Sequence, residues 1–462
     1  MRIHIQGICG TLMAGVAVLA KQLGYQVSGT DKAMYPPMSH QLQDHAFEIS
    51  LDNQPMLQGV AHAIVGNAMS RGQTEVEALL NAGIPYSSGA GWLAEQVLAK
   101  RKVLAVAGTH GKTSTSSMLL WIMQSAGLKP GYLIGGVPKF LKASADIGID
   151  DWFVIEADEY DSAFFDKRAK CLNYKPFAAI INNLEFDHAD IYKNLLAIQA
   201  VFKQWVRCLP SHGALICPAQ SPNIHAIAQT ANQWTQVECL HQQEGWLIKL
   251  SKDFPQTAEW FYQGVSQGQF QADWLCAPMA ENALAAIVMA QHVVKLPAAV
   301  IAKALSNYPG VARRLECKGL RGKQVLYDDF AHHPSAIKQV CSALRARHPD
   351  QPLLVCLELG AYTLQQQAQL PALVDALQQA DQILMIRSEK ATIDYEALNV
   401  QLSGRLRVFS QPAALLDKVK LLLAPNSVVI TLSSREFVGV RQPLFDWWQL
   451  TAESANCDVS LI

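Results

Sequence analysis

Short apolar runs alternate with amphipathic stretches along most of this chain. The runs are rich in Val, Ile, Leu and Ala, which is typical of buried strands, and the stretches between them repeat apolar residues at a helical spacing. Strands that alternate with helices build parallel sheets, so the pattern predicts an α/β fold. In the first part of the chain we expect strands at residues 2–6, 25–30, 61–65 and 84–87 and helices at residues 11–23, 75–82 and 92–99.

The alternation continues after Arg101-Lys102 and again after Tyr308-Pro-Gly310. Residues from about 210 to 275 differ, because they carry short alternating runs without a helical period, and we expect an antiparallel β insertion there. The expected elements of these two parts are strands at 103–107, 152–157, 177–181, 324–327, 353–357, 382–386, 406–409 and 428–432 and helices from 112, over 279–294, 335–347, 370–379 and 412–423. The chain is therefore predicted to form an N-terminal Rossmann-like domain (1–100), a central P-loop ATPase-like domain with a parallel sheet plus the β insertion (101–309) and a C-terminal Rossmann-like domain (310–462).

The composition narrows the class of protein. A chain of 462 residues with 50% apolar and 17% charged residues can build several large cores. Its net charge of −1 gives no electrostatic reason to expect nucleic acid or a membrane as partner. Ten scattered cysteines without a C-x-x-C pair, and the lack of an apolar run of ~18 residues, predict a cytoplasmic protein with free thiols. The oligomeric state is left open between a monomer and a weak homo-oligomer.

The clearest chemical signal is the stretch VLAVAGTHGKTSTSSMLL, an apolar strand followed by a glycine-rich turn and a helix. The helix is expected to begin at Lys112, where free backbone N–H groups and the helix dipole favour a phosphate chain. Lys112 adds a positive charge toward the terminal phosphates, and the Thr113 hydroxyl can hold Mg²⁺. Gly108 and Gly111 let the backbone approach the phosphates, although Val106 stands where a P-loop usually has its first glycine. A plain glycine-rich turn is the alternative.

Acidic groups and a histidine follow the next two predicted strands. Four acids lie within six positions, at Glu156, Asp158, Glu159 and Asp161. Such a cluster repels itself unless a cation is near, so we expect at least one Mg²⁺ ligand, with Glu156 favoured because it leaves the strand first. His188 follows the second strand and is a further metal candidate, although magnesium prefers oxygen. A solvated surface cluster and a structural histidine are the alternatives.

Both outer domains carry candidate residues at strand ends. In the N-terminal domain, the turn at residues 7–10 and Asp31 look like the opening of a Rossmann unit, with the turn for a diphosphate and the acid for a ribose. The spacing is not G-x-G-x-x-G, so it favours NAD only weakly. In the C-terminal domain, Asp329 and His332 follow a strand, and either a simple turn or closure over a nucleotide would explain them. The pair Arg313-Arg314 is either solvated or reaches phosphates on closure.

Taken in order, the motifs GTHGKT, EADEYD and NNLEFDH, the helix with Asn282 near its start, and the motifs RRLE and DDFAHHP resemble the ATP-dependent Mur ligase family. The resemblance covers essentially all 462 residues and all three predicted domains. It implies that ATP phosphorylates the lactyl carboxylate of UDP-N-acetylmuramate and that an amine attacks the acyl phosphate, which yields an amide, ADP and phosphate. The stretches RIHIQGICGT, YPPMS, GNAMSRG, EADEYDSAFFDKR and NNLEFDHADIY favour the branch that joins the recycled tripeptide L-alanyl-γ-D-glutamyl-meso-diaminopimelate.

The resemblance also implies which residues act. Lys112, Glu156 and His188 would be catalytic, and Thr113, Glu156 and His188 would hold Mg²⁺. The residues that would bind ATP are Gly108, Thr109, His110, Gly111, Lys112, Thr113, Ser114, Asn282 at the adenine, and Arg314, Asp329 and His332 from the C-terminal domain. The residues that would bind the UDP-sugar are Gly7, Ile8, Cys9, Gly10, Thr11, Asp31 and Asn67.

Two loops depart from the family pattern. The runs Glu358-Leu-Gly-Ala-Tyr-Thr and Ser433-Ser-Arg-Glu-Phe-Val-Gly stand where relatives often carry Arg-Ser-Asn-Thr and a more glycine-rich loop. Both loops are expected to bind the incoming peptide, and Arg435 is a candidate for a carboxylate contact. Lys203 is the nearby candidate for a carbamylated lysine that several relatives carry. The alternatives are a sister ligase that adds L-alanine, a non-catalytic nucleotide-binding regulator and a nicotinamide dehydrogenase.

Overall fold

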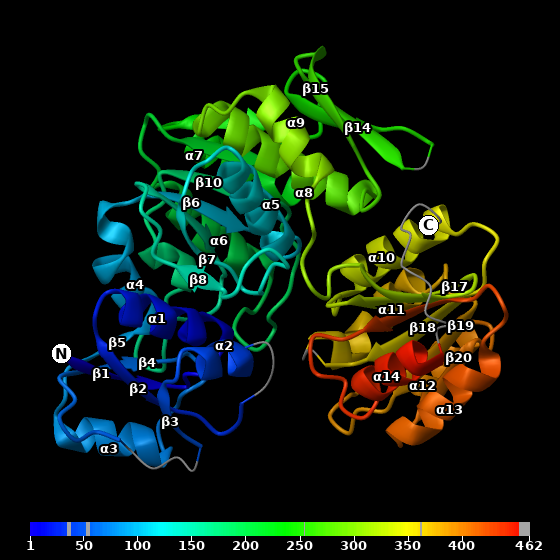
Figure 1. The fold of residues 1–462 in the computed structure, drawn as a ribbon, viewed down its shortest axis with the longest axis horizontal. Coiled ribbons are helices and arrows are strands. Elements are labelled where there is room, and N and C mark those ends of the chain that lie inside the picture. The colour runs from blue at the N-terminus through cyan, green and yellow to red at the C-terminus, as the bar shows by residue number, and fades with distance from the viewer. Residues whose placement is uncertain (35–37, 52–55, 254, 361–362, 452–462) are drawn as a thin grey trace. The chain divides into compact units, whose positions relative to one another are not determined.

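The computed structural model of the chain describes residues 1–34, 38–51, 56–253, 255–360 and 363–451, and it divides into two compact units (Figure 1). The first unit consists of residues 1–186, 191–275 and 279–311. The second consists of residues 187–190, 276–278 and 312 onward. Each unit is built from sheets that are mostly parallel, as the alternating pattern predicts.

A five-stranded parallel sheet forms the N-terminal part of the first unit, in the order β3-β2-β1-β4-β5. Its strands are β1 (Arg2–Gln6), β2 (Gln26–Thr30), β3 (Glu48–Ser50), β4 (His62–Val65) and β5 (Tyr86–Ser88). Its helices are α1 (Thr11–Gln22), α2 (Met38–Asp44), α3 (Thr74–Ala82) and α4 (Gly89–Gln96), followed by the short 3₁₀ helix η1 (Leu98–Lys100). The central strand β1 leads into the turn before α1, which is the arrangement of a Rossmann-like domain.

A seven-stranded sheet forms the centre of the same unit, in the order β12-β11-β10-β6-β9-β7-β8. Its strands are β6 (Lys102–Ala107), β7 (Gly131–Leu133), β8 (Ala145–Asp146), β9 (Trp152–Glu156), β10 (Ala178–Ile181), β11 (Ala214–Cys217) and β12 (Gln236–Cys239). Its helices are α5 (Lys112–Ser125), η2 (Lys170–Asn173), α6 (Leu195–Val206), α7 (Pro222–Ala231), α8 (Ala277–Val288), the π-helical turn η3 (Met289–Val293) and α9 (Ala298–Ser306). All neighbours are parallel except β7 and β8, and β6 lies between β10 and β9.

The predicted β insertion is only partly correct. An antiparallel sheet does form from β13 (Trp246–Leu250), β14 (Gln256–Tyr262) and β15 (Val265–Ala272). The residues before it instead form β11, α7 and β12, which extend the central sheet in parallel. The helix signal was present in the sequence, because Ser221-Pro222 is typical of a helix start. The side chains that α7 buries also follow a helical spacing: Ile224, Ile227, Ala228 and Ala231.

The N-terminal domain packs against the central sheet through its helices α1 and α2. A Cβ at Gly15 of α1 would lie 3.2 Å from the side chain of Leu133, so this glycine lets α1 approach the central sheet closely. The side chain of Gln22 donates to Asp146 at 3.0 Å. The side chain of Gln41 accepts the backbone N–H of Ser144 at 2.6 Å. One continuous apolar core runs through both sheets, so these two domains form a single unit.

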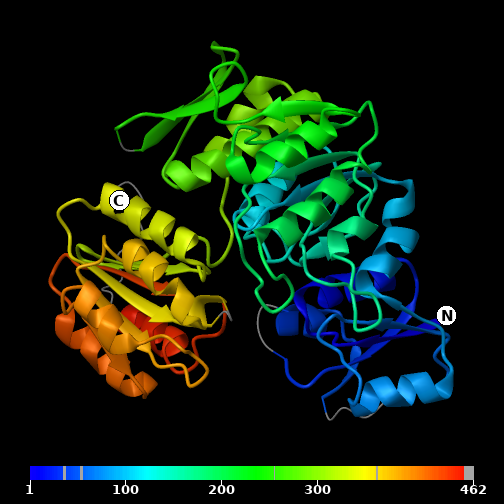
Figure 2. The same cartoon turned by 180° about the vertical axis from the view of Figure 1, so that it is seen from behind.

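The second unit is a six-stranded sheet in the order β16-β17-β21-β18-β19-β20, parallel except for β16. Its strands are β16 (Glu316–Arg321), β17 (Gln324–Asp329), β18 (Leu353–Glu358), β19 (Gln382–Ile386), β20 (Leu406–Phe409) and β21 (Val428–Leu432). Its helices are α10 (Pro334–Arg347), η4 (Thr363–Gln365), η5 (Gln367–Gln369), α11 (Leu370–Ala376), α12 (Tyr395–Gln401), α13 (Pro412–Leu422) and α14 (Arg441–Thr451). Successive strand residues point to two separate cores, with α10, α11 and α12 over one face and α13 and α14 over the other (Figures 1 and 2).

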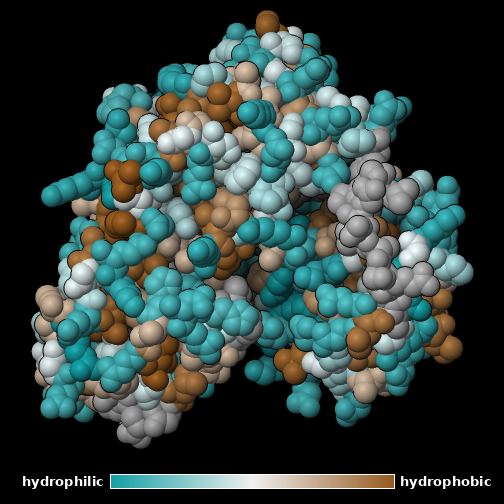
Figure 3. Space-filling model, in the orientation of Figure 1, coloured by the Kyte–Doolittle hydropathy of each residue, from teal (hydrophilic) through white to brown (hydrophobic). Residues whose placement is uncertain are grey.

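The α/β fold class with three domains is confirmed. The strands predicted at residues 2–6, 382–386, 406–409 and 428–432 have the observed bounds, and most other predicted elements differ by a few residues at their ends. On the face shown in Figure 3, hydrophilic side chains predominate and apolar ones are scattered among them. Within the described ranges, no helix has both the length and the apolar character needed to cross a membrane.

Candidate functional site

A glycine-rich turn joins β6 to α5 at the middle of the seven-stranded sheet. Gly108 has a φ of 132°, and a Cβ there would lie 3.0 Å from the backbone oxygen of Asn183. Gly111 has a φ of 80°, and a Cβ there would lie 2.2 Å from Oδ1 of Asn282. Both positions therefore require glycine because the turn is pressed against a neighbouring loop and helix. This packing is a reason for glycine that the sequence did not reveal.

Lys112 is held back over this turn. It begins α5, and its side chain keeps 15% exposure. Its Nζ donates to the backbone oxygen of Gly108 at 2.6 Å and to that of Thr109 at 3.4 Å. The same Nζ lies 3.5 Å from Oε2 of Glu159, whose side chain is only 2% exposed. The ammonium group is thus fixed at the start of the helix, where a phosphate chain would meet backbone N–H groups.

Glu156 and Thr113 meet beside the turn. The hydroxyl of Thr113 donates to Oε1 of Glu156 at 3.0 Å, and the backbone N–H of Gly135 donates to Oε2 at 2.7 Å. The two residues come together because Glu156, at the end of β9, pairs in register with Val106 of β6. A hydroxyl and a carboxylate are oxygen donors of the kind that Mg²⁺ prefers, so the residues present fit this ion.

The rest of the acid cluster is neutralised by lysines. Asp158 lies 3.1 Å from Nζ of Lys170, and Asp161 lies 2.5 Å from Nζ of Lys167. The repulsion within the cluster, from which a metal was expected, is therefore relieved without an ion. This corrects the argument from the sequence, and the case for magnesium rests instead on the Thr113–Glu156 pair.

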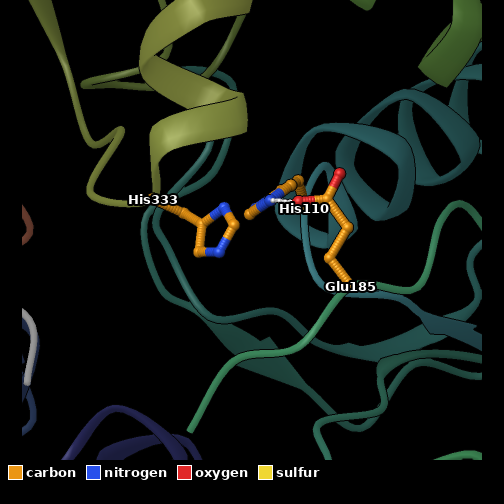
Figure 4. Close-up of side chains that lie close together, drawn as sticks. All are labelled: His110, Glu185 and His333. Atoms are coloured by element: carbon orange, nitrogen blue, oxygen red, sulfur yellow. Dashed lines mark ion pairs between the residues drawn. The ribbon is translucent and has the colours of Figure 1, made fainter. Parts of the chain in front are cut away.

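The loop after β10 clamps the turn. The side chain of Asn183 accepts the backbone N–H of His110 at 2.8 Å and donates to the backbone oxygen of His110 at 3.2 Å. The hydroxyl of Thr109 accepts the backbone N–H of Glu185 at 2.9 Å. Nε2 of His110 lies 3.5 Å from Oε2 of Glu185, the ion pair drawn in Figure 4. The roles of Asn183 and Glu185 were not predicted from the sequence, although the NNLE run was the available signal.

Asn282 reaches the same turn from α8. Its Oδ1 accepts the hydroxyl of Thr115 at 3.3 Å, and that hydroxyl oxygen in turn accepts the side-chain amide of Asn182 at 2.9 Å. This polar chain runs beside Gly111, and the neighbouring Ser114 is buried in α5. The structure therefore places Asn282 next to the P-loop, and its contact with adenine stays a prediction.

His188 and Lys203 lie on other parts of the chain, in the segment 187–190 and in α6. His188 belongs to residues 187–190 of the second unit, has a φ of 55°, and its backbone N–H donates to Oδ1 of Asp187 at 2.7 Å. A positive φ in a histidine is uncommon and indicates a tightly specified loop. Lys203 lies half-buried in α6. Metal binding by His188 and carbamylation of Lys203 both stay predictions.

The N-terminal glycine turn is closed by Asp31. Gly7 has a φ of 74°, and its backbone N–H donates to the backbone oxygen of Thr30 at 2.8 Å, as does that of Ile8 at 3.2 Å. Oδ2 of Asp31 accepts the backbone N–H of Cys9 at 2.8 Å. The carboxylate thus supports the turn, and burial, together with the nearby Asp31 carboxylate, raises the pKa of the Cys9 thiol to about 12.

The last residues of this turn are exposed to solvent. Gly10 and Thr11 are exposed at the start of α1, and Asn67 is half-exposed in the loop after β4. That loop packs on the turn, since a Cβ at Gly7 would lie 3.3 Å from Sδ of Met69. The helix start and the Asn67 loop therefore form one end of the first sheet, as expected for a ligand site at the carboxyl ends of parallel strands.

In the second unit, the residues predicted to bind ATP lie close together, and Asp329 and His332 of one loop bond to nearby backbone groups. Asp329 accepts the backbone N–H of Leu315 at 2.6 Å and that of Ala331 at 2.7 Å, and burial raises the pKa of its carboxyl group. The guanidinium group of Arg314 lies 5.0 Å from the ring centre of Phe330. The other two side chains of this loop also bond to nearby backbone: Nδ1 of His332 to the oxygen of Phe330 at 2.9 Å, and Nδ1 of His333, labelled in Figure 4, to the N–H of Ser335 at 3.4 Å.

The side chain of Arg313 bonds to groups of its own domain. Its NH2 donates to the backbone oxygens of Ser433 at 2.6 Å and Arg435 at 2.8 Å, and its Nε lies 3.7 Å from Asp328. Burial and the nearby Arg441 lower the pKa of Arg313 to about 10. Arg314 therefore stays a candidate for contact with phosphates, whereas Arg313 already bonds within its own domain.

The two loops that depart from the family pattern touch each other in this unit. The hydroxyl of Ser433 donates to Oε2 of Glu358. A Cβ at Gly360 would lie 3.2 Å from Cγ of Arg435, so the arginine side chain passes over the glycine. Of the two loops, Ala361 and Tyr362 lie outside the described residues, as do Tyr35, Pro36 and Pro37 of the YPPMS stretch.

Three family models match the chain in sequence. They are the Mur ligase family catalytic domain at residues 2–101, the Mur ligase middle domain at residues 106–290 and the Mur ligase glutamate ligase domain at residues 313–435.

Individual proteins match over most or nearly all of the chain. The UDP-N-acetylmuramate–L-alanyl-γ-D-glutamyl-meso-2,6-diaminoheptandioate ligase of Escherichia coli K12 is 40% identical, over 99% of this chain and 100% of its own. A UDP-N-acetylmuramate–L-alanine ligase of Arthrobacter is 34% identical over 77% of this chain and 75% of its own. The crystal structure of a murein peptide ligase from Psychrobacter arcticus is 33% identical, with a TM-score of 0.73 over 99% of this chain and 100% of that one.

Proposed function

The chain belongs to the Mur ligase family, and on that premise we propose that it joins L-alanyl-γ-D-glutamyl-meso-diaminopimelate to UDP-N-acetylmuramate. It is an ATP-dependent ligase that acts in the building of peptidoglycan. The tripeptide is proposed because the relative of 40% identity carries it in its name and matches over 99% of this chain. Because the proposed reaction uses ATP and a nucleotide sugar, we propose that it takes place in the cytoplasm.

One observation carries the proposal. Lys112 and the Thr113–Glu156 pair converge where the adjacent strands β6 and β9 end, at the start of α5. A phosphate chain at this point would meet a helix N-terminus, an ammonium group and a pair of oxygen donors. These are the parts that transfer of a phosphoryl group requires, because its catalysis is mostly positioning and neutralisation of charge.

The chemistry follows from this arrangement. A carboxylate is a poor electrophile, and phosphorylation of the lactyl carboxylate supplies a leaving group that the peptide amine can displace. Lys112 would neutralise the phosphoryl group during transfer, and the glycine turn would hold the phosphates through its backbone N–H groups. The start of α1 and Asn67 would hold the UDP-sugar, and Asn282 and Arg314 would contact the nucleotide.

Magnesium fits the Thr113–Glu156 pair, which would hold it, and His188 is proposed as a further ligand. When bound, it would offset the negative charge of the phosphates. The hydroxyl of Thr113 and the carboxylate of Glu156 already lie 3.0 Å apart, so both oxygen donors would be in place to hold the ion.

Product analysis tests the proposal. The protein would be incubated with UDP-N-acetylmuramate, ATP and either the tripeptide or L-alanine, while phosphate release is followed and the product mass is measured. We expect phosphate release that requires all three substrates, with the tripeptide preferred and a product of the amide mass. A clear preference for L-alanine would identify the sister ligase instead, and absence of phosphate release with every peptide would support a non-catalytic regulator.

A further inference from the structure

Glu159 has no part in the reaction described above, yet it lies beside the lysine that the phosphates would meet. Its Oε2 is 3.5 Å from Nζ of Lys112, and its side chain is 2% exposed. On the other side, Nζ of Lys112 donates to the backbone oxygens of Gly108 and Thr109. The ammonium group therefore rests between a buried carboxylate and the inner side of the glycine turn.

The backbone around Glu159 is fixed. The hydroxyl of Tyr192 donates to the backbone oxygen of Glu159 at 2.5 Å. Asp158, one residue earlier, is tied to Lys170 at 3.1 Å, and the backbone N–H of Lys170 donates to the backbone oxygen of Tyr160 at 2.8 Å. These bonds hold the backbone on both sides of Glu159, so the side chain starts from a fixed point beside Lys112.

We propose that Glu159 is a positioning residue that holds Lys112 over the glycine turn and competes with the incoming phosphates for the same ammonium group. This inference rests on the proposed function in one respect, namely that the phosphates of ATP bind at Lys112. Glu159 should therefore have two opposite effects, one on nucleotide binding and one on turnover. A negative charge beside the ammonium group weakens its attraction for another anion, so nucleotide binding is weakened. A fixed ammonium group is already placed for the transferring phosphoryl, so turnover is raised.

The variant Glu159→Gln separates these consequences. It keeps the shape of the side chain and removes the charge. We expect the Kd for ADP with Mg²⁺, measured by calorimetry, to fall by about three- to tenfold, while kcat with all substrates saturating falls by about tenfold. A purely structural role would weaken binding and turnover together.

Asp166→Asn is the matched control. Asp166 lies in the same segment and loses the same charge, but its partner is Arg168 at 2.7 Å, not the P-loop lysine. We expect its Kd for ADP and its kcat to match those of the unaltered enzyme.

A second variant, Glu159→Asp, keeps the charge and shortens the reach, so it answers the question if the glutamine variant fails to fold. We expect a Kd for ADP between that of the unaltered enzyme and that of Glu159→Gln, because the charge is kept but lies farther from Lys112, and a lower kcat. An unchanged or raised Kd in Glu159→Gln, or an unchanged kcat in Glu159→Asp, would overturn the inference. Lys112→Ala in the same calorimetry separates the two proposals: if it leaves the Kd for ADP unchanged, the proposed phosphate site itself is wrong. If it weakens ADP binding and Glu159→Gln does not tighten it, only the role of Glu159 is wrong.

Discussion

The P-loop of the first unit and the Asp329 loop of the second unit both follow a buried strand, but their polar side chains have different duties. At the P-loop, Lys112 and Glu156 bond to groups on other elements and gather at the start of a helix. In the Asp329 loop, the carboxylate accepts two backbone N–H groups from its immediate surroundings. The first arrangement gathers groups that suit a ligand, whereas the second keeps its own loop in shape.

The comparison shows what a polar residue at a strand end can mean. A parallel sheet brings such residues to one edge, whichever duty they serve. The duty depends on whether the chain itself satisfies the side chain, which only the three-dimensional structure reveals. Substitutions in the two regions should therefore fail in different ways, with lost activity at the first and lost stability at the second.

The largest effect is expected for Lys112→Ala. Removal of the ammonium group should lower kcat by about 10³-fold, because the phosphoryl group would then be transferred without its nearest positive charge. Phosphate release would measure this loss, and circular dichroism would check that the fold is kept. Lys249→Ala is the control, since Lys249 lies over the ring of Phe261 in the β insertion, and it should retain full activity. Equal losses in both variants would contradict a specific role for Lys112.

Asp328→Asn should show the opposite failure in the second unit. Asp328 is 1% exposed, and its carboxylate lies 3.1 Å from Arg441 and 3.7 Å from Arg313. Loss of its charge would leave the buried Arg441 and the half-buried Arg313 without it, which should cost about 3–4 kcal/mol of unfolding free energy. Denaturant unfolding would measure this cost.

Asp375→Asn removes an equal charge from an exposed pair with Lys338 in the same unit, and its unfolding free energy should change little. A similar small change in Asp328→Asn would show that the loop does not depend on this network. Calorimetry should find that the Asp328 variant still binds ADP, since the P-loop lies in the other unit.

Much of this architecture follows from the sequence, because its strands are short apolar runs between clear helix signals. The bounds of β1, β19, β20 and β21 follow from that contrast alone. The antiparallel prediction failed at α7, where the helical spacing of four small and branched residues is masked by glutamines and asparagines. The resemblance implies that Thr113 and Glu156 hold the same ion, and the structure shows why they meet, because Glu156 pairs in register with Val106 of the strand that leads into the P-loop.

Other features of the site could not be read from the chain. The contact of Asn282 with Gly111 joins residues far apart in sequence, and no periodicity encodes it. The lysines that neutralise the acid cluster are visible in the sequence, but their pairing depends on how the loop closes. The commitment of Arg313 to Ser433 and Arg435 likewise depends on the packing of distant loops.

Gly111→Ala would test that packing, with Gly127→Ala as its control. Both glycines have a positive φ, 80° and 84°, but a Cβ at Gly127 would meet nothing within 4 Å. The unfolding free energy of Gly127→Ala should fall by about 1–2 kcal/mol from backbone strain alone. Gly111→Ala should lose about 1–2 kcal/mol more, because its Cβ would overlap Asn282. Denaturant unfolding would measure both values, and adding Asn282→Ala should recover the difference. Equal losses at the two glycines would mean that the turn yields easily.

The smallest effect is the pH dependence of stability that arises from one buried histidine in each unit. The two units should behave alike in this respect if their difference is confined to strand ends. His4 in β1 of the first unit and His348 after α10 of the second are both buried, and burial, aided by a neighbouring arginine, lowers the pKa of each imidazole from 6.5 to about 4. Between these values the unfolded chain binds more protons than the folded one, so stability falls as the pH falls from 6.5 toward 4.

Replacement of either histidine by glutamine should remove this dependence in its own unit. When the pH is lowered by about one unit from 6.5, the unfolding free energy of His4→Gln should rise by about 1 kcal/mol relative to that of the unaltered protein. The unfolding free energy of His348→Gln should rise by a similar amount. Hydrogen exchange of peptides that cover β1 and β17, corrected for the intrinsic rate at each pH, would read the two units separately. A pH-dependent gain in one unit with none in the other would show that the contrast between the units extends into their sheets.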